Sequence, residues 1–320
     1  MLDNFIFSLN AVLPIFITVI IGALLRRFSS LPREFYEGSE KFVFKIALPC
    51  MLFLDVATAP VAALSEQIPL VLFCVIGIVA ACALLCVFVP IFVKDNGKRG
   101  AMIQGMFRSN VAILGVPFAI SAFGDGCRAS VVALVPFVVI TYNVLATIVL
   151  CVFAPKDKKM SAGETIKKVL PGIVKNPLII GIALGLPFMF LGLSIPTVAE
   201  KVVSGFSDTV TALSLVSIGA GFEMSKIKGR IAESVVAAIV KVGVIPLAML
   251  CIAIAMGYRG TSLGLVLIIF ATPTAVSSYI MAKNMNSDHA LAAQILMLST
   301  LLSMGAIFWG LFLLKSLNFL

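Results

Sequence analysis

The residues best suited to bind a ligand lie in the middle of two long apolar stretches. The first stretch contains FRSNVAILGVPF at 107–118, where Asn110 is followed by Gly115 and Pro117. A proline removes a backbone donor and clashes with the preceding turn of a helix. The second stretch contains ATPTAVSSY at 271–279 and also predicts a broken helix. Its proline and hydroxyl side chains are Pro273, Thr272, Thr274, Ser277, Ser278 and Tyr279.

Two broken helices of this kind suit a negatively charged ligand. The N-terminal end of a helix carries about half a positive charge and free N–H donors. Two such ends meeting at one point would form a site for an anion, most simply a carboxylate. The alternative is an ordinary kink, because proline is common in membrane helices. Pro14, Pro49, Pro136 and Pro246 show how freely this chain uses it, but only the two stretches combine a break with polar side chains.

Three more polar residues lie inside apolar stretches. Lys241 lies about ten residues into its stretch, roughly 15 Å deep at 1.5 Å per residue. A charge at that depth should be paired or functional, so we expect Lys241 to supply a fixed cation beside the broken helices or to release a proton. Arg108 is shallower, and we expect its side chain to reach the interface by snorkelling. Asn143 follows the first break and is a candidate for binding the substrate or for interhelical hydrogen bonding.

The composition places all these residues in a membrane protein. Hydrophobic residues make up 61% of 320 positions, charged residues make up 12%, and the mean hydropathy is +1.13. Soluble domains are about 45–50% apolar. The apolar runs are continuous rather than alternating, which indicates membrane-spanning helices. We expect an all-α polytopic protein with ten transmembrane helices at 5–25, 42–60, 68–93, 101–123, 128–153, 170–192, 206–223, 231–256, 261–283 and 289–314.

The net charge of +9 reflects membrane topology rather than nucleic-acid binding. Lys and Arg gather in the connections after the first, third, fifth and seventh stretches, and short basic loops stay cytoplasmic. This pattern predicts a multi-pass protein of the cytoplasmic membrane with both termini outside. The first run lacks the features of a removable signal peptide and is predicted to be a span. The seven cysteines show no metal-binding or disulfide pattern, and we expect no cofactor or metal.

The chain divides into two halves of five helices each. The regions are a first repeat at 1–153, a cytoplasmic linker at 154–169 and a second repeat at 170–320. Because each half has an odd number of helices, the second half enters the membrane from the opposite side, as in an inverted repeat. Pro117 and Pro273, both in the fourth helix of their half, lie 156 residues apart. Matching interruptions in both halves point to the binding site of a transporter.

These motifs resemble the auxin efflux carrier family, which includes the plant PIN proteins and bacterial permeases. The resemblance covers almost the whole chain and rests on the asparagine and GVP of span 4, on Lys241 with Pro246, and on ATPTAVSSYIMA in span 9. NPLIIGIALGL, with Asn176, Pro177 and Gly181, and SIGAGF, which ends span 7, also match. The resemblance implies an inverted-repeat fold of the bile-acid-symporter (NhaA-like) type in which helices 4 and 9 cross. It also implies elevator-like secondary transport of small organic anions such as malate or malonate.

Two features depart from the plant pattern. The central loop is short, and span 9 lacks a second proline, which argues against an auxin-like substrate. The exact crossing point is left open between Pro273 and Ser278. We therefore predict a secondary carrier for small carboxylates, surrounded by lipid. Proton coupling, simple uniport and a homodimer remain open.

A cation/proton antiporter, a membrane-embedded enzyme and a channel are the alternatives to this carrier. A cation/proton antiporter normally needs a carboxylate near the crossing, and the sequence places none near Asn110 or Pro273. A membrane-embedded enzyme would require clustered acids or histidines at one membrane face. The chain has a single histidine, His289, which we expect at the surface. A channel is a further alternative, because broken helices also line pores.

Overall fold

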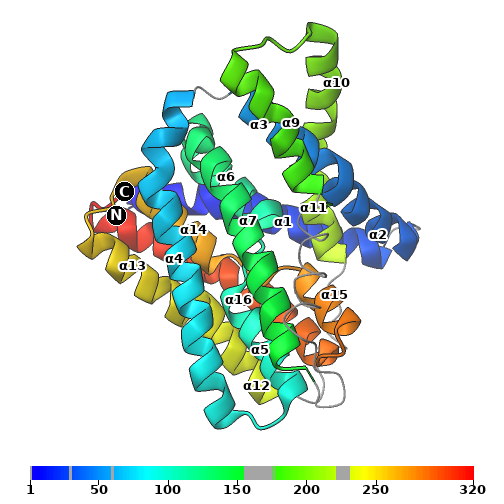
Figure 1. Ribbon diagram of the computed structural model, residues 1–320, viewed down its shortest axis with the longest axis vertical. Helices are drawn as coiled ribbons and strands as arrows, with labels where there is room; N and C mark the ends of the chain where they lie inside the picture. The colour runs from blue at the N-terminus through cyan, green and yellow to red at the C-terminus, as the bar shows by residue number, and fades with distance from the viewer. Residues whose placement is uncertain (1, 29–30, 59–60, 155–174, 176, 221–230) are drawn as a thin grey trace.

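A computed structural model describes residues 2–28, 31–58, 61–154, 175, 177–220 and 231–320 (Figure 1). Within these ranges the regular elements are helices, apart from one isolated β-bridge. The predicted linker at 154–169 lies outside the described residues except for Ala154, and so does Asn176.

The first half of the chain contains four long helical rods and one interrupted rod. Helix α1 (Leu2–Phe28) and α7 (Arg128–Val152) stay continuous although Pro14 and Pro136 lie inside them. The bounds of the other elements are α2 (Arg33–Phe42), the π-helix η1 (Val43–Ala47), α3 (Leu48–Ala57), α4 (Val61–Phe92), α5 (Asn96–Phe107), the π-helix η2 (Val111–Gly115), α6 (Val116–Phe123) and the 3-10 helix η3 (Gly124–Cys127).

The second half follows a similar order and adds one helix that the sequence prediction missed. This additional element, α10 (Thr197–Ser207), has no buried residue and packs on α3. The other elements are α9 (Pro177–Leu191), α11 (Thr209–Ala220), α12 (Ile231–Ile239), the π-helix η6 (Val240–Val244), α13 (Ile245–Ala255), α14 (Gly260–Ala271), α15 (Ser277–Asn284) and α16 (His289–Ser316).

The lengths and composition of these helices are those of a polytopic membrane protein. Five described helical stretches are long and apolar enough to cross a bilayer: Leu2–Phe28, Glu66–Phe92, Ala133–Val152, Ile231–Ala255 and His289–Ser316. Shorter apolar helices, including Gly260–Ala271, accompany them. The multi-pass architecture agrees with the sequence, whereas the count of ten spans stays a prediction.

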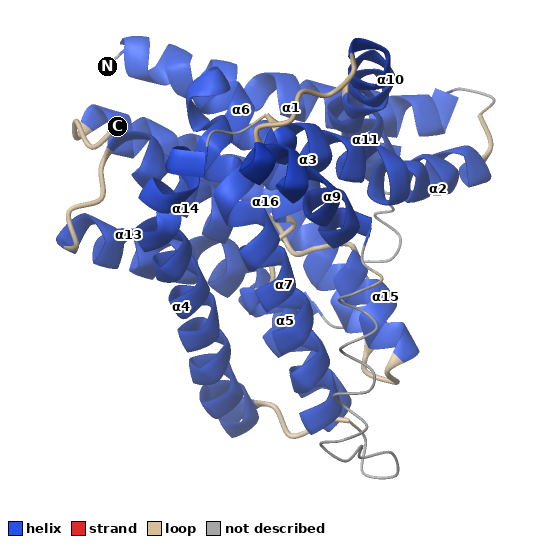
Figure 2. Ribbon diagram, turned by 45° about the horizontal axis from the view of Figure 1, so that its top comes forward, coloured by secondary structure: helices blue, strands red, loops and turns tan. Residues whose placement is uncertain are grey.

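The helices form two groups. In one group α1 packs against α11 and α3 packs against α9, and Figure 1 shows α2, α3, α9, α10 and α11 together at the upper right. In the other group α4 packs against α5 and α7, α12 packs against α16, and α13 packs against α14. Figure 2 shows α4 and α5 descending side by side, with no strand drawn among the described residues.

Glycines bring the helices of the first group into backbone contact. Gly181 and Gly185 form a GxxxG pair on α9, and a Cβ at Gly185 would lie 2.9 Å from the carbonyl oxygen of Phe53 on α3. A Cβ at Gly219 on α11 would collide with the carbonyl group of Val19 on α1. In lipid, helices associate largely through such close packing. The sequence GIALG at 181–185 therefore forms a close-packing surface between α9 and α3.

Candidate functional site

The two interrupted helices meet near the centre of the second group. The chain is non-helical at Arg108–Asn110, between α5 and η2, and at Thr272–Val276, between α14 and α15. Ser109 and Thr274 form an antiparallel bridge. The backbone N–H of Asn110 donates a hydrogen bond to the carbonyl oxygen of Pro273 at 2.8 Å. We call this contact between the two non-helical segments the crossing.

The first break lies earlier in the chain than the residues expected to cause it. Gly115 ends the π-helix η2, and Pro117 occupies the second position of α6, so the chain remains helical through both. Proline is tolerated in the first turn of a helix, and the preceding π turn changes the hydrogen-bond register ahead of it. The break therefore falls at Arg108–Asn110, and Asn110 is the N-cap of η2.

The three described π-helices share a short sequence motif that ends in proline. The sequences VFKIALP, VAILGVP and VKVGVIP each contain a five-residue π-helix, one further residue and then Pro49, Pro117 or Pro246. Valine begins all three. Single π turns are frequent at functional sites, and η2 and η6 both adjoin the crossing. The spacing from valine to proline is visible in the sequence, but the π turns themselves were not predicted from it.

Lys241, which lies in η6, joins the two broken helices. Its side chain is 0% exposed. The ammonium group donates to the Oγ of Ser109 and, at 2.8 Å, to the carbonyl oxygen of Phe270. Phe270 lies in the last turn of α14, where the helix dipole favours a positive charge. The hydroxyl of Tyr142 also donates to the Oγ of Ser109 at 3.2 Å. The structure thus places Lys241 beside the broken helices, as the sequence predicted.

Arg108 is buried and does not snorkel to the interface. The residue is 3% exposed. Its guanidinium group donates to the Oδ1 of Asn143 and the Oγ of Ser277, both at 2.7 Å, and to the Sδ of Met281 at 2.8 Å. The snorkelling interpretation was wrong because acceptors from α7 and α15 are available at this depth. Arg108 is therefore a second cation at the crossing, beside Lys241.

The two buried cations have no buried acidic partner in the described part of the chain. The buried polar and charged residues include Arg108 and Lys241 but no Asp or Glu. The described ion pairs, such as Lys98–Glu233, involve other residues. Burying a charge is costly unless it is paired. The crossing therefore carries excess positive charge that a bound anion would offset.

Several of the predicted binding residues support the backbone of the crossing. Thr274 donates from Oγ1 to the carbonyl oxygen of Gly105 at 2.6 Å, and its N–H donates to the Oγ of Ser299 at 3.1 Å. Thr272 donates from Oγ1 to the carbonyl oxygen of Ile269 at 3.3 Å. Together with Pro273, these residues satisfy backbone groups that the breaks leave without helical partners. Contact between them and a substrate stays a prediction.

Other predicted residues have free polar groups near the crossing. The side-chain amide of Asn110 makes no hydrogen bond among the described residues, although its backbone caps η2. The hydroxyl of Ser278 is fully buried and has no partner in the described part of the chain. The carbonyl oxygen of Ser278 accepts from Gln104 at 2.9 Å. Tyr279 contacts His289 edge to face, with the ring centroids 6.1 Å apart, and His289 is exposed.

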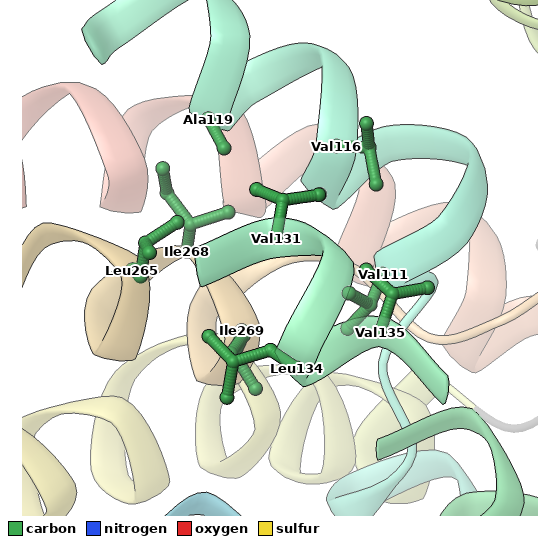
Figure 3. A pocket seen from close by; sticks show the side chains of 10 residues that line it. Val111, Val116, Ala119, Val131, Leu134, Val135, Leu265, Ile268 and Ile269 are labelled. Atoms are coloured by element: carbon green, nitrogen blue, oxygen red, sulfur yellow. The ribbon is translucent and has the colours of Figure 1, made fainter. Parts of the chain in front are cut away.

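A small apolar pocket lies beside η2 and has a different character. Figure 3 shows its lining side chains converging from α6, α7 and α14. None of the lining residues is polar, so the pocket cannot neutralise a charge. Gly115 is the only predicted binding residue in its wall. The lining residues are Val111, Gly115, Val116, Ala119, Val131, Leu134, Val135, Leu265, Ile268 and Ile269.

The described residues offer no metal site. No group of three His, Cys, Asp or Glu side chains among them could hold a metal ion. All seven cysteines are free thiols. The polar groups available at the crossing are instead cations, amides and hydroxyls, a set suited to an anion.

Comparison with known proteins agrees with this architecture. A family model described as "Membrane transport protein" matches residues 7–309. The chain belongs to this membrane transport protein family. This confirms the resemblance that the motifs indicated. An "Uncharacterized transporter" of Methanothermobacter thermautotrophicus is 21% identical over 301 residues, covering 94% of this chain and 96% of the relative. "Uncharacterized transporter MJ1031" of Methanocaldococcus jannaschii is 24% identical over 323 residues, covering 96% and 99%.

Proposed function

We propose that this member of the membrane transport protein family is a secondary carrier for small organic anions, such as malate-like or malonate-like carboxylates. The observation that carries the proposal is the pair of buried cations at the crossing. Arg108 and Lys241 have no buried acidic partner among the described residues. A carboxylate would offset this charge and accept hydrogen bonds from charged donors.

The anion would lie at the crossing, between the ends of the broken helices. The first turn of η2 leaves backbone N–H groups without intrahelical partners, whereas in the first turn of α15 the N–H groups of Ser278 and Tyr279 donate to the carbonyl oxygens of Ala275 and Val276. Both ends also carry partial positive charge. Asn110 adds a side-chain amide that makes no hydrogen bond within the described residues. These groups complement the two cations, and they come from opposite halves of the chain.

The packing supports a 5+5 inverted repeat with one moving and one fixed group. The pairing of α1 with α11 is mirrored by that of α3 with α9. Likewise, α4 contacts α5 and α7, while the helical unit of α12 and α13 contacts α14 and α16. We propose that spans 3, 4, 5, 8, 9 and 10 form the moving core. Spans 1, 2, 6 and 7 would form the scaffold, and two copies could associate as a dimer.

The termini support an even number of spans. The side-chain amide of Asn4 donates to the Oγ of Ser316 at 3.3 Å, so the two ends of the chain lie on the same side of the protein (Figure 1). Together with the basic loops, this favours a cytoplasmic-membrane protein with both termini outside. The half-helices α5 and α15 would then lie on the cytoplasmic side of the crossing, and α6 and α14 on the outer side.

The absence of a buried acid at the described crossing weighs against the antiporter alternative. Antiporters of related architecture need a carboxylate that exchanges a proton for a cation. The same absence leaves few charged ligands for a sodium ion. We therefore favour proton-coupled transport or uniport over sodium-coupled transport.

Uptake into proteoliposomes tests this function directly. Purified protein would be assayed with radiolabelled acetate, lactate, malonate, malate and succinate, with pH and sodium gradients imposed separately. We expect saturable uptake of at least one acid, faster with a pH gradient if protons are coupled. Protein-free liposomes give the background. No saturable uptake of any carboxylate, or a strict requirement for sodium, would contradict the proposal.

A further inference from the structure

The two buried cations are held in different ways. Lys241 donates to groups that belong to the broken helices themselves, the Oγ of Ser109 and the carbonyl oxygen of Phe270. Both partners are buried, and Tyr142, which also contacts Ser109, is 2% exposed. A ligand could reach Lys241 only by displacing hydrogen bonds that hold the crossing together.

Arg108 has weaker partners and a more open surrounding. Asn143, Ser277 and Met281, which accept its three hydrogen bonds, are each only partly buried. None of these acceptors is charged, and a thioether sulfur is a weak acceptor. The Nε–H group makes no hydrogen bond among the described residues. Arg108 therefore retains donor capacity on a side that a ligand can approach.

Two further donors adjoin Arg108. Ser277 begins α15, so the positive end of that helix lies next to the guanidinium group. The following residue, Ser278, has a fully buried hydroxyl without a partner in the described part of the chain. A hydroxyl in this state costs free energy unless a ligand or water bonds to it. The free Nε–H of Arg108 thus lies next to the N-terminal end of α15, and the unpartnered hydroxyl of Ser278 belongs to the same helix start.

We propose that Arg108 binds the carboxylate of the substrate directly, while Lys241 holds the crossing together. The proposal rests on the proposed function and deepens it. The guanidinium group is planar and matches a carboxylate with two parallel hydrogen bonds, which an ammonium group cannot do. The carboxylate would replace the thioether of Met281 as an acceptor and would approach from the side of α5 and α15. Arg108 is then the residue that selects an anion.

Kinetics of three variants test this assignment. Uptake of the acid transported best by the unmodified protein would be measured for Arg108→Gln, Arg108→Lys and the control Arg33→Gln. We expect Arg108→Gln to lose about 100-fold in kcat/KM, because a charged hydrogen-bonded pair is lost. Arg108→Lys keeps the charge but not the planar guanidinium group, so KM should rise about 10-fold. Arg33→Gln breaks an exposed ion pair with Glu37 on α2 and should stay within about 2-fold of the unmodified protein.

A binding measurement separates a ligand contact from a structural role. Thermal unfolding would be followed in detergent with and without a high concentration of the same acid. The acid should raise the Tm of the unmodified protein and of Arg33→Gln, but not that of Arg108→Gln. If Arg108→Gln does not fold, Arg108→Lys carries the test.

The two proposals fail in different ways. If the unmodified protein transports no carboxylate, the proposed function is wrong. If it transports one, but the Arg108 variants keep KM within about 2-fold of the unmodified protein or are still stabilised by the acid, only the assignment of Arg108 is wrong. Loss of basal stability in Arg108→Lys without any change in KM would also overturn the assignment, because it would make Arg108 structural.

Discussion

At the scale of single residues, the crossing separates side chains that stabilise the protein from side chains that remain free. Thr274 and Lys241 donate to backbone carbonyl groups that the broken helices expose. Asn110 occupies the same region, but its amide makes no hydrogen bond within the described residues. Substitution should therefore affect folding at the first two positions and ligand binding at the third.

Replacing Asn110 by alanine should impair transport without destabilising the protein. The side chain loses no hydrogen bond in the described structure, and the backbone bond to Pro273 is retained. We expect the Tm to change by less than about 2 °C while uptake falls at least about 10-fold, because a hydrogen bond to a charged ligand is lost. Thermal unfolding and uptake of the variant test both parts. Undiminished uptake would remove Asn110 from the binding site.

Replacing Lys241 by methionine should destabilise the protein and stop transport. The change leaves the carbonyl oxygen of Phe270 without its side-chain donor. An unsatisfied buried group costs about 1–3 kcal/mol, so the midpoint of thermal unfolding should fall. Lys283, which is exposed at the end of α15, provides a matched Lys→Met control. A stable, active Lys241→Met protein would contradict the structural role assigned to this lysine.

At the scale of elements, the π-helices determine which side chains face the crossing. The π-helix η6 lies between α12 and α13 and carries Lys241. A π turn contains one residue more than the equivalent α turn. Compared with a continuous α-helix of the same sequence, it therefore rotates the preceding residues relative to those that follow. Helices α1 and α7 stay continuous through Pro14 and Pro136, so proline alone does not create this arrangement.

Inserting one alanine after Gly243 should turn Lys241 away from the crossing. One added residue in a helix rotates α12 relative to α13 by about 100°. We expect uptake to be lost in the insertion variant. Gly243→Ala is the control, because a Cβ at this position meets nothing within 4 Å and should leave uptake unchanged. Equal uptake by the insertion variant and the control would show that the orientation of Lys241 toward the crossing is dispensable.

At the scale of the whole molecule, the proposed alternating access requires the proposed core to move against the scaffold. The side chains of Asn4 on α1 and Ser316 on α16 touch across these two groups. The rings of Phe53 on α3 and Phe188 on α9 lie 5.5 Å apart within the scaffold. These two contacts provide a matched pair for cross-linking.

A cross-link between core and scaffold should block transport. In a background without the seven native cysteines, Asn4→Cys with Ser316→Cys would be joined by a short thiol-reactive cross-linker. We expect uptake to stop after cross-linking and to return when a cleavable linker is reduced. Phe53→Cys with Phe188→Cys joins two scaffold helices and should leave uptake unchanged. Full activity of the cross-linked α1–α16 pair would exclude movement between these groups at that contact.

Local sequence patterns were enough to predict the membrane class, most helix positions and the presence of two interruptions. These features depend on local hydropathy and on proline, which act over one helix length. The sequence also identified Lys241, since a charge deep in an apolar run needs a partner. The exposed helix α10 was missed because its short amphipathic pattern lies between two strongly apolar runs.

The contacts of Arg108 and the position of the first break depend on parts of the chain that lie far apart in the sequence. The acceptors of Arg108 include Asn143, 35 residues away, and Ser277, 169 residues away. A pattern within one helix cannot show that such distant groups meet. Snorkelling was predicted because burial looks too costly for an isolated charge. In the folded protein that cost is reduced by neighbours that the chain brings together only when both halves pack around the crossing.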